Sequence, residues 1–245
     1  MKRTLLTGME STPAIGLLLA QLCLPILAAS VEPKSGSIEG RITFSGTPPP
    51  STVLTHDGAS QAVLYVGPSG GLRYAVVYRP NASRTATPVP PPVTLNQRGF
   101  IFEPQVIAVR AGQTVRFTNE DPANHNVRAQ DSSPANTFSL NTASGARGPF
   151  VHQFAPTPPG EALELSCDIH PWMAAWVYVF EHDQFAATSE DGTFRIGGVP
   201  PGRHRIAVRQ PAGPLARDVA VDVRAGETTR LDVAFSSSDV GMPAR

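Results

Sequence analysis

Proline and glycine interrupt this chain so often that few stretches could form a helix. The 245 residues include 25 prolines and 21 glycines. Proline removes a backbone donor and clashes inside a helix, and glycine favours turns. Several of the short segments between them alternate apolar and polar side chains with the period of two that is typical of a β-strand. Because no convincing amphipathic helix is present, the sequence predicts an all-β protein, best arranged as two β-sandwiches.

The strand candidates form three groups along the chain. In the first group, residues 37–46 alternate apolar and polar side chains, and residues 74–80 are apolar enough for a more fully buried strand. Proline and small polar residues then indicate a linker or an extended surface loop over 81–92. In the third group, which starts near residue 183, an Asp-Gly turn and a Pro-Pro-Gly turn separate further strands.

The second group begins at residue 93. Two strand candidates flank the turn signal "RAGQ" at 110–113, and their alternation predicts a half-buried antiparallel hairpin. The similar turn "RAGE" at 224–227, in the third group, predicts another hairpin. Ser, Asn, Thr, Ala and Gly dominate 129–148, so we expect a loop there. We expect the last ten residues, 236–245, to form a flexible tail.

The first thirty residues have the features of a secretory signal peptide. Two basic residues precede an apolar run from Ala14 to Ala29, and small residues come just before Val31. The run is interrupted and shorter than the roughly 20 residues that a membrane-spanning helix needs. We therefore expect a signal peptide at 1–30, a periplasmic or secreted protein, and no stable insertion into a membrane.

Charge and cysteine content narrow the functional classes. The chain has 20 basic and 20 acidic residues, which gives no reason to expect nucleic acid or an anionic membrane as a partner. Of its two cysteines, Cys23 lies inside the predicted signal and would be removed with it. Cys167 is then alone, and a lone cysteine in an exported protein indicates an intermolecular disulfide, a reactive thiol or a metal ligand.

Cys167 belongs to the segment "CDIHPWM", in which His170 follows three residues later and Met173 three residues after that. A thiolate and an imidazole at this spacing reach one metal ion from a single tight loop, and the thioether comes from the same loop. The best candidate for a further strong ligand is His125, in the predicted loop segment "NEDPANHNV". Two histidines, a cysteine and a weakly bound methionine form the ligand set of a blue-copper electron-transfer site.

These motifs resemble those of the cupredoxin family. The segment "CDIHPWM" has the C-x-x-H-P-aromatic-M spacing of amicyanin, and "HNV" at 125–127 has the His-Asn that opens the copper site in relatives of plastocyanin and amicyanin. Residues 93–182 resemble a cupredoxin domain. Together with the continuation through residue 202, they are similar to exported methylamine-utilisation-like proteins, in which the cupredoxin is joined to a carboxypeptidase-regulatory-like β-sandwich.

The resemblance implies a Greek-key cupredoxin sandwich and a second, small sandwich of the immunoglobulin or transthyretin type. The expected division is a signal peptide at 1–30, N-terminal strands and a Pro-rich linker at 31–92, the copper domain at 93–182, the regulatory-like sandwich at 183–235 and the tail at 236–245. Residues 37–80 also resemble the first strands of the regulatory-like sandwich. One hypothesis is therefore that the copper domain is inserted into a discontinuous second domain.

The resemblance also implies a ligand set for one type 1 copper site. His125, Cys167 and His170 match the strong equatorial ligands, and Met173 matches the weak axial ligand. Cys167 taken alone is equally well explained as a small buried hydrophobe. The coincidence of histidine and methionine at the expected spacing is what favours the metal.

Four neighbouring residues are expected to support the site, two of them through the same resemblance and two through their position beside His170. Asn126 matches the asparagine that ties the two ligand loops together. Asp168 departs from the family pattern, in which Ser or Thr is frequent, and its negative charge would lower the reduction potential. Trp172 and Pro171 are expected in an apolar rim around the edge of His170, where a redox partner docks.

Three functions compete for this site. The first is a one-electron carrier with an unidentified redox partner protein, and the second is copper binding, storage or delivery without a redox-carrier role. The third is catalysis by Cys167 and His170 as nucleophile and base. Because the thioether of Met173 contributes little to acyl transfer, we expect no enzymatic activity.

Overall fold

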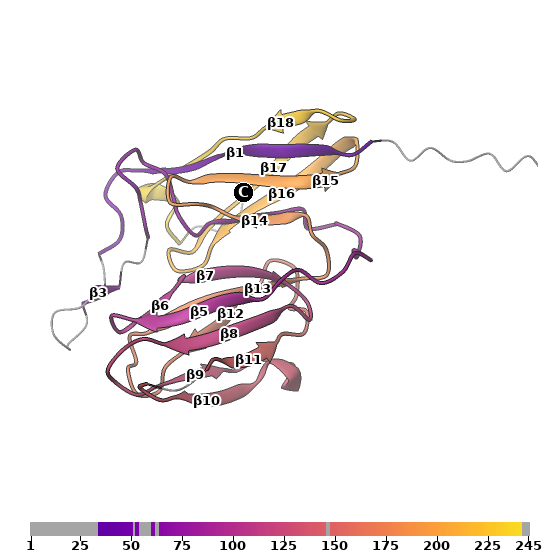
Figure 1. The fold of residues 1–245 in the computed structure, drawn as a ribbon. Coiled ribbons are helices and arrows are strands. Elements are labelled where there is room, and N and C mark those ends of the chain that lie inside the picture. Colours follow the sequence, from indigo (N-terminus) through magenta and orange to yellow (C-terminus); the bar gives the residue numbers. More distant parts are fainter. Residues whose placement is uncertain (1–33, 51, 54–59, 62–63, 146–147, 242–245) are drawn as a thin grey trace, which may run out of the picture. The chain divides into compact units, whose positions relative to one another are not determined.

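The computed structural model describes residues 34–50, 52–53, 60–61, 64–145 and 148–241. Strands form almost all of the regular structure in these ranges (Figure 1), and the exceptions are two short 3-10 turns, η1 Pro134–Asn136 and η2 Ser237–Asp239. The predicted all-β class is therefore confirmed. The predicted signal peptide at 1–30 lies outside the described residues. Within them, no helix has the length and apolar character needed to cross a membrane.

Strands from the two ends of the described chain build one sandwich, which we call the split sandwich. Its first sheet contains β15 Thr193–Val199, β1 Gly36–Ser45, β18 Thr228–Arg230 and β19 Val233–Ser236. Its second sheet has the order β14 Phe185–Ala187, β4 Val76–Tyr78, β16 Gly202–Gln210 and β17 Leu215–Val223. A separate pair is formed by β2 Thr52–Val53 and β3 Ser60–Gln61.

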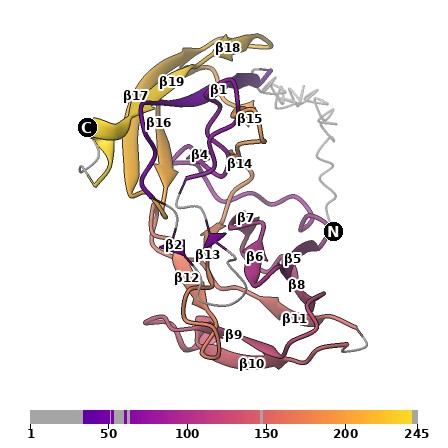
Figure 2. The ribbon, with the colours of Figure 1, turned by 90° about the vertical axis from the view of Figure 1, so that its left-hand side faces the viewer.

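The partners of β1 and β4 show how the split sandwich is assembled, and β4 pairs antiparallel with β14 and β16. β1 pairs antiparallel with β15 and parallel with β18 and β19, so the indigo strand lies beside orange and yellow strands in Figures 1 and 2. Its predicted apolar positions Ile38, Ile42 and Phe44 are buried in one core with residues of β16. Strands from before residue 93 and after residue 182 therefore share sheets and a core. The likeness of this sandwich to a regulatory-like module stays a prediction.

The strands between residues 93 and 180 form a second sandwich, which we call the central sandwich. One sheet has the order β10 Phe138–Thr142, β9 His125–Ala129, β12 Leu163–Ser166, β13 Ala174–Phe180 and β7 Val106–Arg110. The other has the order β11 Phe150–Gln153, β8 Thr114–Asn119, β5 Val93–Arg98 and β6 Ile101–Glu103. Apolar side chains of both sheets meet in one buried cluster. Cys167 and Met173 belong to that cluster.

Strand β13 is buried on both faces, which accounts for the unbroken apolar run "AAWVYVF". Ala175, Val177 and Val179 point into the core of the central sandwich. The alternate residues Tyr178 and Phe180 belong to another buried cluster, which also contains side chains of β4, β7 and β16. A strand held in this way provides a firm anchor for the loop that precedes it, residues 167–173.

Both predicted "RAG" hairpins are wrong, because each turn connects two different sheets. β7 pairs parallel with β13, whereas β8 pairs parallel with β5 and antiparallel with β11. Similarly, β17 pairs with β16, whereas β18 pairs with β1. In each turn a glycine with positive φ, Gly112 at 77° or Gly226 at 71°, reverses the chain. Alternation indicated correctly that one face of each strand is buried. Because strands in both sheets of a sandwich have a buried face, alternation does not show that two successive strands pair with each other.

Two segments predicted to be irregular contain regular structure. Residues 129–148 include β10, an edge strand that pairs antiparallel with β9 through five residues from Phe138 to Thr142. Its polar composition is compatible with an edge strand because one face is exposed. In the predicted tail, η2 is closed by a capping box between Ser236 and Asp239, and Asp239 forms an ion pair with Arg217 at 2.6 Å. Residues 242–245 lie outside the described residues.

Candidate metal centre

The first predicted ligand, His125, is the opening residue of β9. The strand pairs with β10 on one side, where His125 is opposite Thr142, and with β12 on the other. The side chain is buried, with 1% of the residue exposed. His125 follows the short segment 120–124, in which proline and asparagine prevent regular pairing.

The remaining predicted ligands lie in the loop between β12 and β13, residues 167–173. Because Ser166 pairs with Arg128 in the ladder between β12 and β9, the next residue, Cys167, emerges beside the start of β9. The amide of Met173 donates to the carbonyl of His170 at 2.9 Å, and this bond closes the loop just before β13. Adjacent strands thus bring together residues that are more than forty positions apart in the sequence.

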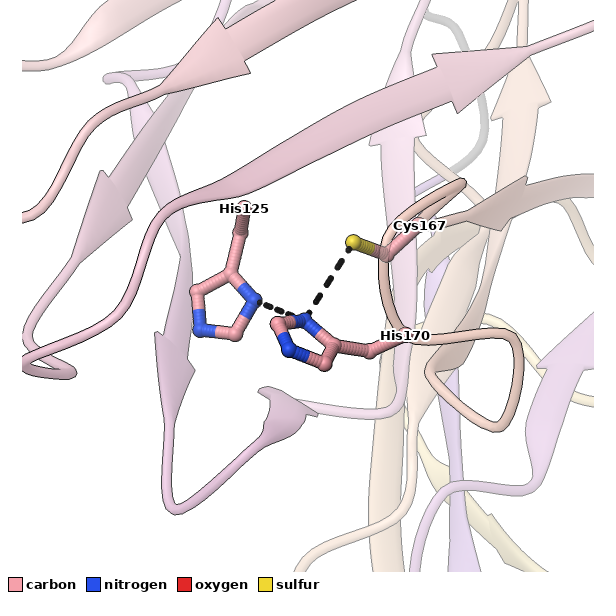
Figure 3. A group of neighbouring side chains, drawn as sticks. All are labelled: His125, Cys167 and His170. Carbon is pink, nitrogen blue, oxygen red and sulfur yellow. Dashed lines mark hydrogen bonds between the residues drawn. The ribbon is translucent and has the colours of Figure 1, made fainter. Parts of the chain in front are cut away.

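The ligand atoms of His125, Cys167 and His170 all lie within 4.8 Å of one another. Figure 3 shows the two rings and the sulfur converging from the start of β9 and the 167–173 loop. The Nδ1 atoms of the two histidines are 2.8 Å apart, and the sulfur of Cys167 is 3.8 Å from Nδ1 of His170. Cys167 is 2% exposed and His170 is half-buried. Three of the four predicted ligands therefore form one group.

The fourth predicted ligand, Met173, lies in the buried apolar core. Its side chain is fully buried in the same apolar cluster as Cys167, and no part of the residue is exposed. Burial in the core agrees with a thioether that fills space, and methionine adapts well to such a position. Its role as axial ligand stays a prediction.

The surroundings of Cys167 favour its thiolate. Burial raises the pKa of the thiol, but hydrogen bonding with His125 and with the backbone amides of Asn126, His170 and Ile169 lowers it, and the net pKa lies below the ordinary value. Because the thiolate is the form of cysteine that binds metals, this environment prepares the sulfur for a metal ion.

The pKa of His125 is shifted in the opposite sense. Burial lowers it, but hydrogen bonds to Cys167 and Asp121 and the negative charges of both groups raise it, and the net pKa lies above the ordinary value. The carboxylate of Asp121 is the partner of Nε2, at 2.9 Å. Nδ1 is the nitrogen that faces His170 and the sulfur.

Asn126 and Asp168 form the cross-link between the two ligand loops. The amide of Asp168 donates to the side-chain oxygen of Asn126 at 2.7 Å, and the side-chain nitrogen of Asn126 donates to the Asp168 carboxylate at 2.7 Å. The same nitrogen donates to Ser139 on β10. Asp168 also pairs with Arg128 at 3.3 Å. The Asp168 carboxylate thus accepts a hydrogen bond from Asn126 and takes part in the link between the two loops.

An apolar and aromatic rim surrounds His170. Its ring lies 5.3 Å from the ring of Trp172 and 5.2 Å from that of Phe100, measured between centroids. Trp172 is half-buried and donates from Nε1 to the carbonyl of Phe100 at 3.1 Å. Pro171 is exposed, and 52% of Ile169 is exposed. Docking of a partner at this rim stays a prediction.

Two residues of the site were not predicted from the sequence. Asp121 is four positions before His125, and the pattern D-P-A-N-H was the one available sign of its contact with that ring. Phe100 belongs to the turn between β5 and β6, far from the ligands in sequence, and its ring contacts both His125 and His170. No sequence pattern indicated its position.

The other described histidines have partners outside the His125, Cys167 and His170 group. His152 packs between the rings of Phe138 and Phe154. Nε2 of His204 contacts the carbonyl of Pro200, and Nδ1 of His182 accepts the amide of Gln184. His56 lies outside the described residues.

The fold and the site together define an all-β sandwich protein with a His-Cys-His group, two of whose residues are buried, at one end of the central sandwich. No protein-family model matches the chain, and no curated protein matches it. The similar solved structures include a copper-containing nitrite reductase from Thermus scotoductus, which is 24% identical. The match covers 42% of this chain and 26% of that chain, with a TM-score of 0.32. They also include a purple cupredoxin from Nitrosopumilus maritimus, which is 23% identical over 36% of this chain and 98% of that chain, with a TM-score of 0.28. Amicyanin from Paracoccus versutus is 16% identical over 42% of this chain and 96% of that chain, with a TM-score of 0.30.

Proposed function

We propose that the protein is an exported copper protein that transfers single electrons. His125, Cys167 and His170 would bind one type 1 copper, with Met173 as the weak axial ligand. The observation that carries the proposal is the convergence of one nitrogen from each of two imidazole rings and one cysteine sulfur within 4.8 Å of one another at the end of a buried core. Bound copper would supply a one-electron Cu(II)/Cu(I) couple.

The chemistry of the donor atoms supports copper over the harder metals. The group offers one soft sulfur and two imidazole nitrogens, whereas Mg²⁺, Ca²⁺ and Mn²⁺ prefer oxygen ligands. The neighbouring carboxylate of Asp121 contacts Nε2 of His125, on the side of the ring that faces away from His170. Zinc accepts sulfur and nitrogen as well, so the metal found in the native protein is part of the test.

The cross-link between the ligand loops suits an electron carrier. Asn126 joins β9 to the 167–173 loop through two hydrogen bonds of 2.7 Å, and β13 anchors the other end of that loop. Loops held at both ends keep the donor atoms of Cys167 and His170 in place when the charge of the site changes. A site designed to release copper would gain nothing from this rigidity.

His170 provides the route by which the electron enters and leaves. His125 and Cys167 are buried, whereas the ring of His170 is half-buried within its rim of aromatic and apolar side chains. A redox partner protein would dock on this rim and cover Trp172, Pro171 and Ile169. The predicted signal peptide places the encounter in the periplasm or outside the cell.

Reversible redox cycling separates electron transfer from copper storage or delivery. The protein is expressed without added metal, its native metal is identified, and the copper form is reduced and reoxidised repeatedly in the presence of a copper chelator. We expect one copper per chain and full recovery of the oxidised form. Loss of the metal to the chelator would favour delivery, and native zinc would exclude both copper functions.

A further inference from the structure

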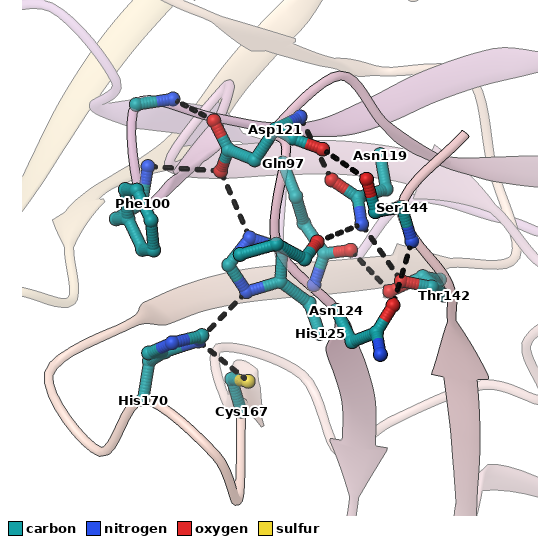
Figure 4. A network of polar contacts seen from close by, with 12 residues as sticks. Gln97, Phe100, Asn119, Asp121, Asn124, His125, Thr142, Ser144, Cys167 and His170 are labelled. Atoms are coloured by element: carbon teal, nitrogen blue, oxygen red, sulfur yellow. Dashed lines mark hydrogen bonds and ion pairs between the residues drawn. The ribbon is translucent and has the colours of Figure 1, made fainter. Parts of the chain in front are cut away.

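Asp121 is a buried carboxylate that contacts the His125 ring and the turn at 99–100. Only 6% of the residue is exposed. One oxygen accepts the amide of Gly99 at 2.6 Å, and the other accepts the amide of Phe100 at 3.0 Å and contacts Nε2 of His125 at 2.9 Å. A buried charge is tolerated when it is fully hydrogen-bonded, and these three donors meet that condition. Figure 4 shows the carboxylate between the 99–100 turn and the imidazole.

We propose that Asp121 sets the donor strength of His125 and thereby lowers the reduction potential of the copper centre. This inference rests on the proposed function of the site. Asp121 would be a positioning residue, because it acts through His125 and its carboxylate does not reach the metal-binding atoms.

The first step of the inference concerns the tautomer of His125. A carboxylate oxygen accepts hydrogen bonds, so Nε2 of His125 carries the proton and donates it to Asp121. In the neutral ring Nδ1 then holds the lone pair, and Nδ1 is the atom that lies 2.8 Å from Nδ1 of His170, on the side of the ring that faces the other two ligands (Figure 3). The contact therefore presents the correct nitrogen to the metal before any metal arrives.

The second step concerns charge. A carboxylate that accepts the outer N–H of a metal-bound imidazole raises the basicity of that ligand. The more highly charged oxidised ion gains more from a basic ligand and from a nearby negative charge than the reduced ion does. Because Asp121 and His125 are both buried, water screens this effect weakly. Asp121 therefore lowers the reduction potential of the copper centre.

The third step concerns rigidity of the carboxylate itself. The amide of Asp121 donates to the side-chain oxygen of Asn119 at 2.9 Å, and its carbonyl accepts the hydroxyl of Ser144 at 3.2 Å. The side-chain nitrogen of Asn119 donates in turn to the carbonyls of Ala123 and Thr142. The backbone of Asp121 is thus fixed from two sides, as Figure 4 shows.

The same carboxylate also holds the aromatic cover of the site. Phe100 has a φ of 61°, which is rare for a bulky residue and costs energy unless surrounding bonds enforce it. Asp121 provides such bonds through the amides of Gly99 and Phe100. The ring of Phe100 then lies 5.5 Å from that of His125 and 5.2 Å from that of His170.

The test compares D121N with E120Q in the full chain. Both variants remove one negative charge from adjacent positions, but the Glu120 side chain is largely exposed and forms a surface pair with Arg98. In D121N we expect Cu(II) affinity to fall about tenfold more than Cu(I) affinity, which raises the reduction potential by about 59 mV. We expect E120Q to match the wild type. A potential in D121N equal to that in E120Q, with the copper absorption intact, would overturn the inference.

A second measurement needs neither the variant nor copper. Nitrogen-15 NMR of the metal-free wild-type protein at alkaline pH reports which nitrogen of His125 carries the proton. We expect a slowly exchanging proton on Nε2, and a proton on Nδ1 would refute the role of Asp121 even if D121N does not fold. Absence of thiolate-to-copper absorption in the wild type and in E120Q alike would instead refute the proposed function.

Discussion

Replacement of Asn126 by alanine should loosen the metal centre without touching a ligand. Asn126 is 4% exposed and makes three side-chain hydrogen bonds, at 2.7, 2.7 and 3.2 Å. Each bond contributes about 1 kcal/mol net, but the Asp168 carboxylate is half exposed and regains water as a partner. The expected loss is therefore about 2 kcal/mol in the free energy of unfolding, or roughly 4–8 °C in Tm for a protein of this size.

The same change should weaken copper binding by roughly 10–100-fold, because the two ligand loops are no longer tied together. Denaturant unfolding of the metal-free protein and competition with a copper chelator measure the two effects separately. Asn141→Ala is the matched control, since Asn141 lies opposite Asn126 on β10 but points to solvent. A loss of stability below about 0.5 kcal/mol, or equal copper affinity in the two variants, would refute the assigned role of Asn126.

Further predictions concern the fold, the thiolate and the rim. Gly192→Ala should destabilise the protein by more than about 2 kcal/mol, because Gly192 has a φ of 84° and a Cβ would lie 2.2 Å from a backbone oxygen. Gly197→Ala, which has open space, should change the unfolding free energy little; equal losses would contradict the packing of this turn. In the metal-free protein the Cys167 pKa lies below its unfolded value, so the thiolate stabilises the fold above the unfolded pKa, and this contribution disappears as the pH falls through the folded pKa. Ultraviolet titration of the thiolate should therefore give a midpoint that rises in His125→Ala, and an unchanged midpoint would exclude their hydrogen bond. Trp172→Ala should slow electron exchange between oxidised and reduced molecules without removing the copper absorption, and an unchanged exchange rate would exclude Trp172 from the contact surface.

The convergence of the donor atoms could be predicted because its chemistry is local. Cys167 and His170 lie in one loop whose spacing already limits their separation, and His125 is followed by the Asn126 that ties β9 to that loop. The contact between Asp121 and His125 depends on how residues 121–125 fold, and Phe100 arrives from a turn more than twenty residues away. Neither has a periodic pattern, so the sequence alone did not reveal them.

The all-β class of the fold was predictable from the sequence, but the pairing of its strands was less predictable. Alternation in residues 106–110 and 114–119 correctly marked buried faces, yet it carries no information about which strand supplies the hydrogen bonds. The short "RAG" turns therefore suggested hairpins where the chain passes from one sheet to the other. Strand β10 was missed for a related reason, because an edge strand with an exposed face needs few apolar residues.

The central claim is that the Cys167 thiolate and two histidine nitrogens bind one copper ion. Titration of the metal-free protein with Cu(II), followed by visible absorption, tests it most directly. We predict an intense blue or green thiolate-to-copper charge-transfer band that saturates at one equivalent and is absent in Cys167→Ser. A colourless complex, or a band that persists in Cys167→Ser, would contradict this assignment.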